Sequence, residues 1–536
     1  MHDRIPIVDL FAGPGGLGEG FSSLSDGKTF KIVVSAEMDY SSWQTLRLRA
    51  FYRLLKSTES PGLEDYYKFC NGEAAQPWTT DTEEAWTAAG HEARQITLGT
   101  QDGNEELDKV LAKHLDVTKP WVLIGGPPCQ AYSVVGRSRN RGNAEYKPEE
   151  DHRHFLYREY LRIIQRYRPS IFVMENVRGI LTAKVADRQI FHEILVDLAD
   201  PDAALGVESD LPGYTIHSLV ADATFSKGMN PKDIDSSQFV ICSEKHGIPQ
   251  ARHRVILLGI RDDVRVRVGS IDKAQAPTVK SLIGSLPKLR STLSKQVDSD
   301  TNWNVEVKRH FNDLRTAAYE AGKNELADQL LLAGESVGGP LDRGGLRYPK
   351  VNGEGSTGMA TLDSWLLDPK LTRWLNHEAR GHMTSDLKRY AYAAAFAKTT
   401  GASPFGHEQF DLPGLSPAHQ NWESGKFPDR FRVQVADRPS TTITSHISKD
   451  GHYFIHYDPV QCRSLTVREA ARLQTFPDNY FFQGNRTQQF HQVGNAVPPL
   501  LAYKIAHVVD QLLAEEPEQP IAAPQEVADQ MELAAT

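Results

Sequence analysis

The sequence predicts an α/β fold built on a doubly wound, mostly parallel sheet, accompanied by a second, irregular domain. Two observations carry this prediction. Residues 5–260 repeat a short apolar run, a turn-rich break and a stretch of helical periodicity, which is the pattern of strands alternating with helices. From about residue 262 to 430 that alternation gives way to loops rich in Gly and Pro, which indicates a domain of a different kind.

Short apolar runs mark the expected strands, because strands buried in a parallel sheet are apolar on both faces. They cover residues 5–8, 32–36, 122–124, 171–174 and 255–260. Between them, residues 154–167 and 187–198 fit amphipathic helices. Residues 57–98 form a long insertion to which the sequence assigns no role.

Helical signals return after residue 431. Thr466 and Glu469 in "LTVREAARLQTF" have the spacing of a capping box ahead of an amphipathic helix. Pro498 and Pro499 introduce a final helix that runs to about Leu513.

Composition limits the classes of protein that this chain can represent. With 536 residues, 40% of them hydrophobic, it can bury the cores of two or three domains. It has no uninterrupted run of apolar residues that would span a bilayer and no signal-peptide layout, so we expect a cytoplasmic protein without membrane contact. The net charge is -9, of which the tail after residue 513 contributes -6, leaving -3 elsewhere. A basic cleft on the body is therefore compatible with the composition.

The residues that follow the first two apolar runs suggest a nucleoside site. In "DLFAGPGG", Gly13, Gly15 and Gly16 allow a tight turn with close backbone approach to a ligand. Glu37 follows the second run, about 20 residues beyond the glycines, where a carboxylate can accept hydrogen bonds from two ribose hydroxyls. A plain tight turn is the alternative for the glycines alone. Together the two features predict an adenosine-containing cofactor.

Four dispersed cysteines form no CxxC pair, so neither a disulfide framework nor a metal site is expected. Cys70, Cys242 and Cys462 are assigned to the common class of small buried hydrophobes. Cys129 differs, because it follows a rigid Pro127-Pro128 lead-in at a strand end and precedes Arg137, Arg139 and Arg141. This setting favours an accessible, stabilised thiolate.

Charged side chains follow the last two runs. Glu175 follows the apolar run of "SIFVMENV" and brings a carboxylate to the same sheet edge as Cys129. Capping the next helix is its alternative role. Arg252 and Arg254 stand two apart in "QARHR", so we expect both guanidinium groups on one face of an extended segment. Such a pair suits a carbonyl oxygen or a phosphate, and a solvated edge is the alternative.

These stretches, in this order, resemble the motifs of the DNA cytosine-5 methyltransferase family of bacterial restriction-modification systems. "DLFAGPGG" is similar to its first cofactor motif, "GGPPCQAYS" to its nucleophile loop, "MENV" to its acid motif and "QARHR" to its paired-arginine motif. "RPSTTIT" at 438–444 and "QVGNAVPP" at 492–499 resemble its closing motifs. The resemblance spans residues 5 to about 510, apart from the insertion and the irregular region.

The resemblance implies a Rossmann-like fold of the class I S-adenosylmethionine-dependent methyltransferases and a covalent mechanism. Cys129 would add to C6 of a flipped-out cytosine, Glu175 would act at N3, and Arg254 with Arg252 would hold the O2 carbonyl. The methyl group would come from S-adenosyl-L-methionine.

The resemblance also implies the cofactor-binding residues. They are Phe11, Gly13, Glu37, Met38, Pro127 and Asn495, with Gly15 and Gly16 shaping the turn. Met38 would face the adenine, and "GNAVPP" would return the C-terminal segment to the glycine turn. The family's usual Asp-Ile near the third strand is missing from "ITLGTQDG", where Asp102 is a possible substitute.

A division into domains follows from the same resemblance. Residues 1–261 and 431–513 would form the catalytic domain, 262–430 the target-recognition domain, and 514–536 an acidic, disordered tail. Within 262–430, "HEARGH" and "DLKRY" are candidates for DNA contact or for ordinary solvated surface.

The preferred hypothesis is a monomeric, sequence-specific enzyme that methylates C5 of cytosine in double-stranded DNA and protects it from a cognate restriction endonuclease. A tRNA cytosine-5 methyltransferase and a catalytically silent DNA-binding module are the alternatives.

Overall fold

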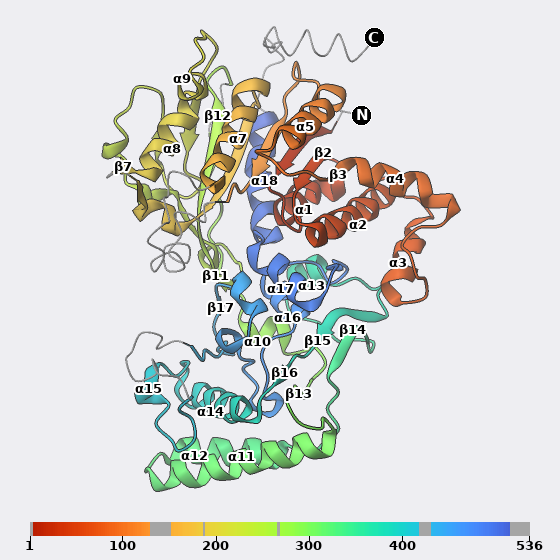
Figure 1. The fold of residues 1–536 in the computed structure, drawn as a ribbon, viewed down its shortest axis with the longest axis vertical. Helices are drawn as coiled ribbons and strands as arrows, with labels where there is room; N and C mark the ends of the chain where they lie inside the picture. Colours follow the sequence, from red (N-terminus) through yellow and green to blue (C-terminus); the bar gives the residue numbers. More distant parts are fainter. Residues whose placement is uncertain (1–3, 129–151, 186–187, 265–267, 418–429, 515–536) are drawn as a thin grey trace.

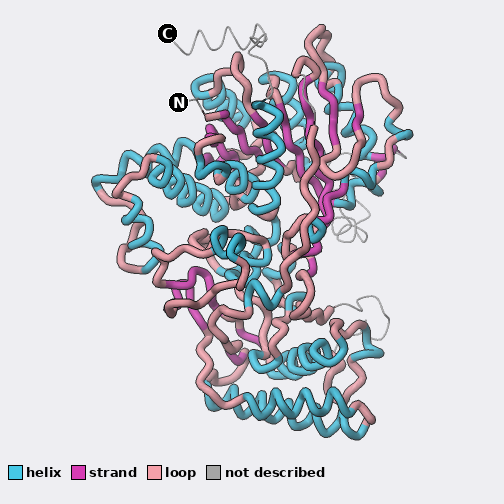
Figure 2. The backbone as a smooth tube through the Cα atoms, turned by 180° about the vertical axis from the view of Figure 1, so that it is seen from behind, coloured by secondary structure: helices cyan, strands magenta, loops and turns pink. Residues whose placement is uncertain are grey.

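The computed structural model describes residues 4–128, 152–185, 188–264, 268–417 and 430–514. Figure 1 shows an upper part built around a large sheet and a lower part dominated by long helices, with short helices and strands between them. Seen from behind in Figure 2, the strands of the large sheet gather in the upper part and the helices flank them.

The large sheet has the order β3-β2-β1-β4-β5-β12-β8-β9, with β10 also paired to β12. The strands are β1 (Ile5–Leu10), β2 (Phe30–Glu37), β3 (Ala93–Gln95), β4 (Val122–Gly125), β5 (Ile171–Val177), β8 (Tyr214–His217), β9 (Thr224–Phe225), β10 (Val240–Cys242) and β12 (His253–Arg261). Strands β3, β2, β1, β4 and β5 are parallel. The chain reverses its winding between β1 and β4, which is the point where ligands bind in such sheets.

The expectation of a parallel strand over 255–260 was wrong. β12 is antiparallel to β5, β8 and β10. Its pairing with β10 explains the direction, because a short connection from Ser243 to Arg252 can join only antiparallel neighbours, whereas a parallel pair needs a long crossover.

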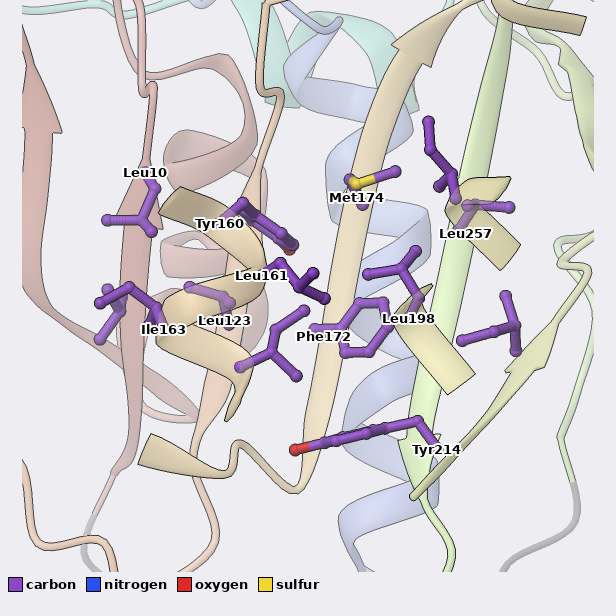
Figure 3. Packing of buried hydrophobic residues seen from close by; sticks show 14 of the residues in the cluster. Leu10, Leu123, Tyr160, Leu161, Ile163, Phe172, Met174, Leu198, Tyr214 and Leu257 are labelled. Carbon is purple, nitrogen blue, oxygen red and sulfur yellow. The ribbon is translucent and has the colours of Figure 1, made fainter. Parts of the chain in front are cut away.

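Helices cover both faces of this sheet. On one face pack α1 (Gly16–Ser22) and α18 (Pro499–Ala514), the expected final helix. On the other pack α5 (Gln101–His114), α7 (His152–Tyr167) and α8 (Ile190–Ala199). Figure 3 shows this second core, with Tyr160 and Leu161 of α7 lying against Phe172 of β5. The predicted helices 154–167 and 187–198 are confirmed as α7 and α8, although Arg188–Gln189 forms the short strand β7.

The segment 57–98 connects the two parts of the molecule. It contains α3 (Leu63–Asn71) and α4 (Glu83–Glu92), and its last residues form β3, the edge strand of the large sheet. Preceded by α2 (Tyr40–Ser57), it shares a core with Leu371, Leu375 and Phe481. Arg347, far along the chain, donates from Nε to the carbonyl oxygens of Phe69 and Cys70, both at 3.1 Å.

The region 262–430 is more helical than its loop-rich sequence indicates. α11 (Asp300–Glu320) and α12 (Asn324–Ser336) form an antiparallel pair that packs on α14 (Thr384–Thr400). One face of α11 is buried and carries Trp303, Val307, Leu314 and Ala318. Their spacing is that of an amphipathic helix. The charged stretch "DLKRY" lies within α14. Shorter elements are α9 (Pro201–Leu205), α10 (Val279–Ile283), α13 (Ala360–Leu366), α15 (Gly406–Gln409), β6 (Lys184–Val185), β11 (Gln250–Ala251), β13 (Thr292–Leu293), β14 (Gly344–Pro349), β15 (Arg373–Glu378), β16 (Gly381–His382) and β17 (Ser440–Thr441).

α16 (Val467–Leu473) begins with the predicted capping box, in which Thr466 Oγ1 accepts from the Glu469 amide and the Glu469 carboxylate accepts from the Thr466 amide. The helix is not amphipathic as expected, because every residue in it is buried. Its charged side chains are paired inside the protein: Glu469 lies 2.7 Å from Arg463, and Arg472 lies 2.6 Å from Asp478. α17 (Arg486–Asn495) follows it.

A single hydrophobic core takes buried residues from the ranges 279–286, 362–374 and 443–496, so elements on both sides of residue 430 pack together. Across the described ranges, none of the helices combines the length and the apolar character needed to cross a membrane.

Candidate active site

The glycine turn after β1 leaves room for a ligand on one side and is closely packed on the other. Gly13 has φ +56°, and no atom lies within 4 Å of the place where a Cβ would stand. At Gly16, in contrast, a Cβ would lie 2.1 Å from the backbone oxygen of Val497. The segment "GNAVPP" therefore returns to the glycine turn as predicted, and only glycine permits this approach.

Glu37 lies at the end of β2 and closes the same turn. Its Oε2 accepts from the Gly13 amide and its Oε1 from the Asp39 amide, each at 2.8 Å. Burial raises the pKa of Glu37, and these two backbone donors oppose the rise. Each carboxylate oxygen retains a further lone pair, so the group can still accept hydrogen bonds from ligand hydroxyls.

The remaining residues expected at the cofactor surround this turn. Met38 is 60% exposed, which leaves an apolar surface beside Glu37 for a flat ring. Phe11 has φ 56° and packs partly against the core, while Gly15 (φ 92°) caps the start of α1. Asn495 ends α17 with an exposed side chain, and Pro127 is buried after β4. The open space at Gly13, the acceptors of Glu37 and the exposed Met38 fit a nucleoside.

Asp102 lies exposed in the first turn of α5. Its position gives no support to a role in reading an adenine.

A carboxylate and a guanidinium meet at the ends of β5 and β12. Glu175 Oε1 lies 2.8 Å from Arg254 Nε, and both side chains are 13% exposed. Arg254 also donates from Nη1 to the His253 carbonyl at 2.9 Å. A Cβ on Gly126 would lie 3.1 Å from Glu175 Oε2, so the start of the "GGPPC" loop runs against this carboxylate. Glu175 is thus held by a cation and does not cap a helix.

Arg252 does not share this place as expected. Its side chain is 2% exposed, and Nη1 donates to the carbonyl oxygens of Ile443 at 2.9 Å and Gly494 at 3.4 Å. Burial and the neighbouring Arg254 lower its pKa. The reason is tertiary: β11, which precedes Arg252, pairs with β17 of the "RPSTTIT" stretch, so the guanidinium faces the C-terminal segments. Arg252 ties the arginine motif to both closing motifs.

Cys129 and the three arginines that follow it lie outside the described residues. The structure describes this loop as far as Pro128.

Most charged side chains of the two stretches that the sequence pointed to for DNA contact are buried, although Glu378 is 41% exposed. His377, Arg380 and His382 of "HEARGH" are 0%, 8% and 4% exposed. In "DLKRY", Arg389 is 6% exposed and pairs with Asp386 at 2.8 Å. The pattern of charges could not reveal this, because the residues that cover them come from distant segments.

Asp9 is a polar residue that the sequence argument missed although it opens "DLFAGPGG". Its side chain is 0% exposed, and neither carboxyl oxygen has a hydrogen-bond partner. Burial, with a smaller contribution from Glu37, raises its pKa from 3.8 to about 8. A carboxyl group in the middle of an apolar strand was the available signal.

The known proteins that this chain resembles in sequence are DNA methyltransferases. A family model described as C-5 cytosine-specific DNA methylase matches residues 94–204 and 234–511. The chain is 31% identical to the type II methyltransferase M.Bpa9945I of Bacillus paralicheniformis, over 95% of this chain and 99% of the relative. It is 26% identical to the type II methyltransferase M1.HphI of Haemophilus parahaemolyticus, over 78% and 75% of the two chains. Identity to the DNA (cytosine-5-)-methyltransferase M.ApeKI of Aeropyrum pernix is 24%, over 95% and 99%.

Proposed function

The chain belongs to the family of C-5 cytosine-specific DNA methylases, with S-adenosyl-L-methionine as methyl donor, and from this premise we propose that it methylates cytosine within a specific sequence of double-stranded DNA. The observation that carries the proposal is the pair of Glu175 and Arg254 at 2.8 Å beside Gly126. This arrangement offers a carboxyl group and a guanidinium to one edge of a planar ring.

The chemistry requires help because C5 of cytosine is a weak nucleophile. The Cys129 thiolate adds to C6, which moves electron density to C5, while a proton held between the Glu175 carboxyl group and N3 balances the charge that develops on the ring and Arg254 holds O2. C5 would then take the methyl group from the bound donor, whose carbon–sulfur bond breaks to leave S-adenosylhomocysteine. A base removes the C5 proton, the C6–sulfur bond breaks, and the thiolate leaves with its electron pair as the aromatic ring returns. Since C6 is covered in stacked DNA, the cytosine is flipped out of the helix.

Residues around the glycine turn bind the methyl donor in this proposal. Glu37 accepts hydrogen bonds from the ribose hydroxyls, Met38 covers one face of the adenine, and Gly13 leaves space for the ligand. Phe11, Pro127 and Asn495 complete the wall, and Gly15 and Gly16 shape the turn. S-adenosylmethionine supplies an electrophilic methyl group when it is bound there.

Arg252 acts as a positioning residue rather than a ligand of the base. Its hydrogen bonds to the carbonyls of Ile443 and Gly494 fix the start of the strand that carries Arg254. Each hydrogen bond from a buried guanidinium to a carbonyl oxygen stabilises the folded state by roughly 1.5–3 kcal/mol, because the donor is charged.

Residues 262–430 serve in this proposal as the target-recognition domain, with 1–261 and 431–513 as the catalytic domain. This region has 22 Lys and Arg against 21 Asp and Glu, so contact with phosphates depends on local placement of charge. The names of the relatives support a role beside a cognate restriction endonuclease, since M.Bpa9945I and M1.HphI are called type II methyltransferases. A monomer suffices, because one base is flipped at a time.

Transfer of tritium from labelled S-adenosylmethionine tests the substrate. We expect label in duplex DNA and none in tRNA. Label only in tRNA would overturn the DNA assignment, and label in neither would favour a silent binding module.

Two substitutions test the catalytic residues. Cys129→Ser should abolish transfer while leaving cofactor binding intact, and DNA carrying 5-fluorocytosine should be trapped covalently by the wild type alone. Glu175→Gln should lower kcat by about 10²–10³-fold with little change in KM, because its contact strengthens in the transition state. Cys462→Ala, at a cysteine 2% exposed, is the matched control and should stay active. A fully active Cys129→Ser protein contradicts the mechanism.

A further inference from the structure

A second cluster of reactive side chains lies where β10 turns toward β12, outside the residues assigned above to catalysis. Cys242 ends β10, Glu244 follows in the turn, and His253 begins β12. Each offers one ligand atom, and these three atoms lie within 4.8 Å of one another. We propose that Cys242, Glu244 and His253 bind one Zn²⁺ ion, with water as the fourth ligand.

The ligand types support zinc over other ions. Thiolate sulfur, imidazole nitrogen and carboxylate oxygen are the groups that zinc takes in proteins, and it accepts four ligands in a tetrahedral arrangement. Calcium and magnesium prefer oxygen ligands alone. A thiolate and a carboxylate together carry two negative charges, which balance the ion while the imidazole stays neutral.

The backbone already holds the three residues together. Cys242 and His253 are direct partners in the antiparallel ladder, so their side chains lie on the same face of the sheet. Between them, Ser243 donates from its amide at 3.2 Å and from Oγ at 2.7 Å to the Arg252 carbonyl. The turn that carries Glu244 is therefore fixed before any ion binds.

The Glu244 carboxylate has an unused oxygen. Oε1 lies 2.8 Å from His253 Nε2, but Oε2 is buried and has no hydrogen-bond partner. The hydrogen bond between His253 and Glu244 gives a partner only to Oε1. Leaving Oε2 buried without a partner costs free energy. A cation between the three side chains would satisfy the second.

The cluster is open enough for an ion to enter. The side chains of Glu244 and His253 are 25% and 33% exposed, and Cys242 is half-buried rather than fully buried as the sequence suggested. Arg178 and Lys245 are the cations close enough to act on the Cys242 thiol. The neutral balance of the filled site limits their repulsion.

The ion would act on structure rather than on the reacting base. Successive residues of a strand point to opposite faces, so His253 points away from its neighbour in β12, Arg254. A bound ion would clamp β10 to β12 behind the strand that presents Arg254 to Glu175. Binding forms a zinc–sulfur bond and releases the thiol proton to solvent, and it needs no oxidant.

Metal titration of the full-length, chelator-treated protein tests this site. We expect one Zn²⁺ per chain to compete with a chromogenic chelator. Co²⁺ should give the charge-transfer absorption of a thiolate ligand. Cys242→Ala and His253→Gln should each weaken Zn²⁺ binding by at least about 100-fold, since losing only an outer partner of a ligand costs 10–100-fold. Glu244→Gln keeps the fold of the turn and should weaken binding as well.

Two controls separate this site from other thiols. Cys462→Ala removes a buried cysteine, and Cys129→Ser removes the proposed nucleophile; both should retain the charge-transfer band. A band that survives Cys242→Ala, or a wild type that binds no Zn²⁺ in the competition, overturns the proposal. Circular dichroism of each variant shows whether a loss of binding reflects a loss of fold. If Cys242→Ala has lost its fold, the Zn²⁺ affinities of Glu244→Gln and His253→Gln decide the test. None of these results depends on methyl transfer.

Discussion

Asp9 makes the stability of the catalytic part depend on pH in a direction opposite to that of a salt-bridged carboxylate. The folded protein holds this carboxyl group without exposure and without a hydrogen-bond partner, and burial raises its pKa from 3.8 to about 8. The folded state therefore binds the proton more tightly than the unfolded state. The contribution of Asp9 to stability is therefore most favourable below about pH 4 and falls as the pH rises toward 8.

The size of the effect follows from the two pKa values. Between about pH 4 and pH 8, each pH unit lowers the free energy of unfolding by about 1.4 kcal/mol. Ionisation of Asp9 therefore makes the free energy of unfolding about 4 kcal/mol lower at pH 7 than at pH 4. Asp9→Asn keeps the shape of the side chain and removes the ionisation. Between about pH 5 and pH 7, the wild type should lose about 3 kcal/mol more than the variant.

Equilibrium urea unfolding at several pH values measures this difference. All other titrating groups are common to both proteins, so they cancel when the two curves are subtracted. The constant cost of burying an amide cancels as well, because only the slope is compared. Parallel curves for the two proteins would refute the reasoning, since they would mean that Asp9 is already ionised and partnered in the folded state.

Four other substitutions give defined outcomes. Gly16→Ala sets a methyl group 2.1 Å from a backbone oxygen, so calorimetry should show lost cofactor binding together with a lower Tm. Gly13→Ala places its methyl group more than 4 Å from any other atom and should lower stability by only about 1–2 kcal/mol, because of the positive φ. It should still weaken cofactor binding at least about 10-fold, because the methyl group takes ligand space. Unchanged affinity would contradict the placement of the ligand. Arg347→Ala removes bonds to two carbonyls and should destabilise by about 2–4 kcal/mol, seen as earlier proteolysis within α3. Glu469→Gln leaves Arg463 buried without its counter-ion and should cost about 3–5 kcal/mol by chemical denaturation, while retained stability would argue against the pair.

Several features of the fold could be predicted because neighbouring residues encode them. The apolar runs that become β1, β2, β4 and β5 are local patterns, and so is the capping box at Thr466 and Glu469. The glycine turn and Glu37 are recognisable in the same way, since the spacing between a strand end and its polar residues is short.

Other features were hidden because they depend on how distant segments pack. The long amphipathic helix α11 has a regular buried face, yet the Gly- and Pro-rich loops around it dominated the sequence pattern. The edge strand β3 is only three residues long and is stabilised by its pairing with β2. A run this short has no periodicity of its own.

The sequence by itself determined the order of the motifs, the positions of β1, β2, β4, β5 and β12, and the types of side chain available for chemistry. Only the tertiary structure decided how these side chains are used. It paired Glu175 with Arg254, buried Arg252 against the C-terminal segments, and reversed the direction of β12. The physical reason is that side-chain partners and strand directions are set by contacts between residues far apart in the chain, whereas periodicity and capping depend on residues within a few positions of one another.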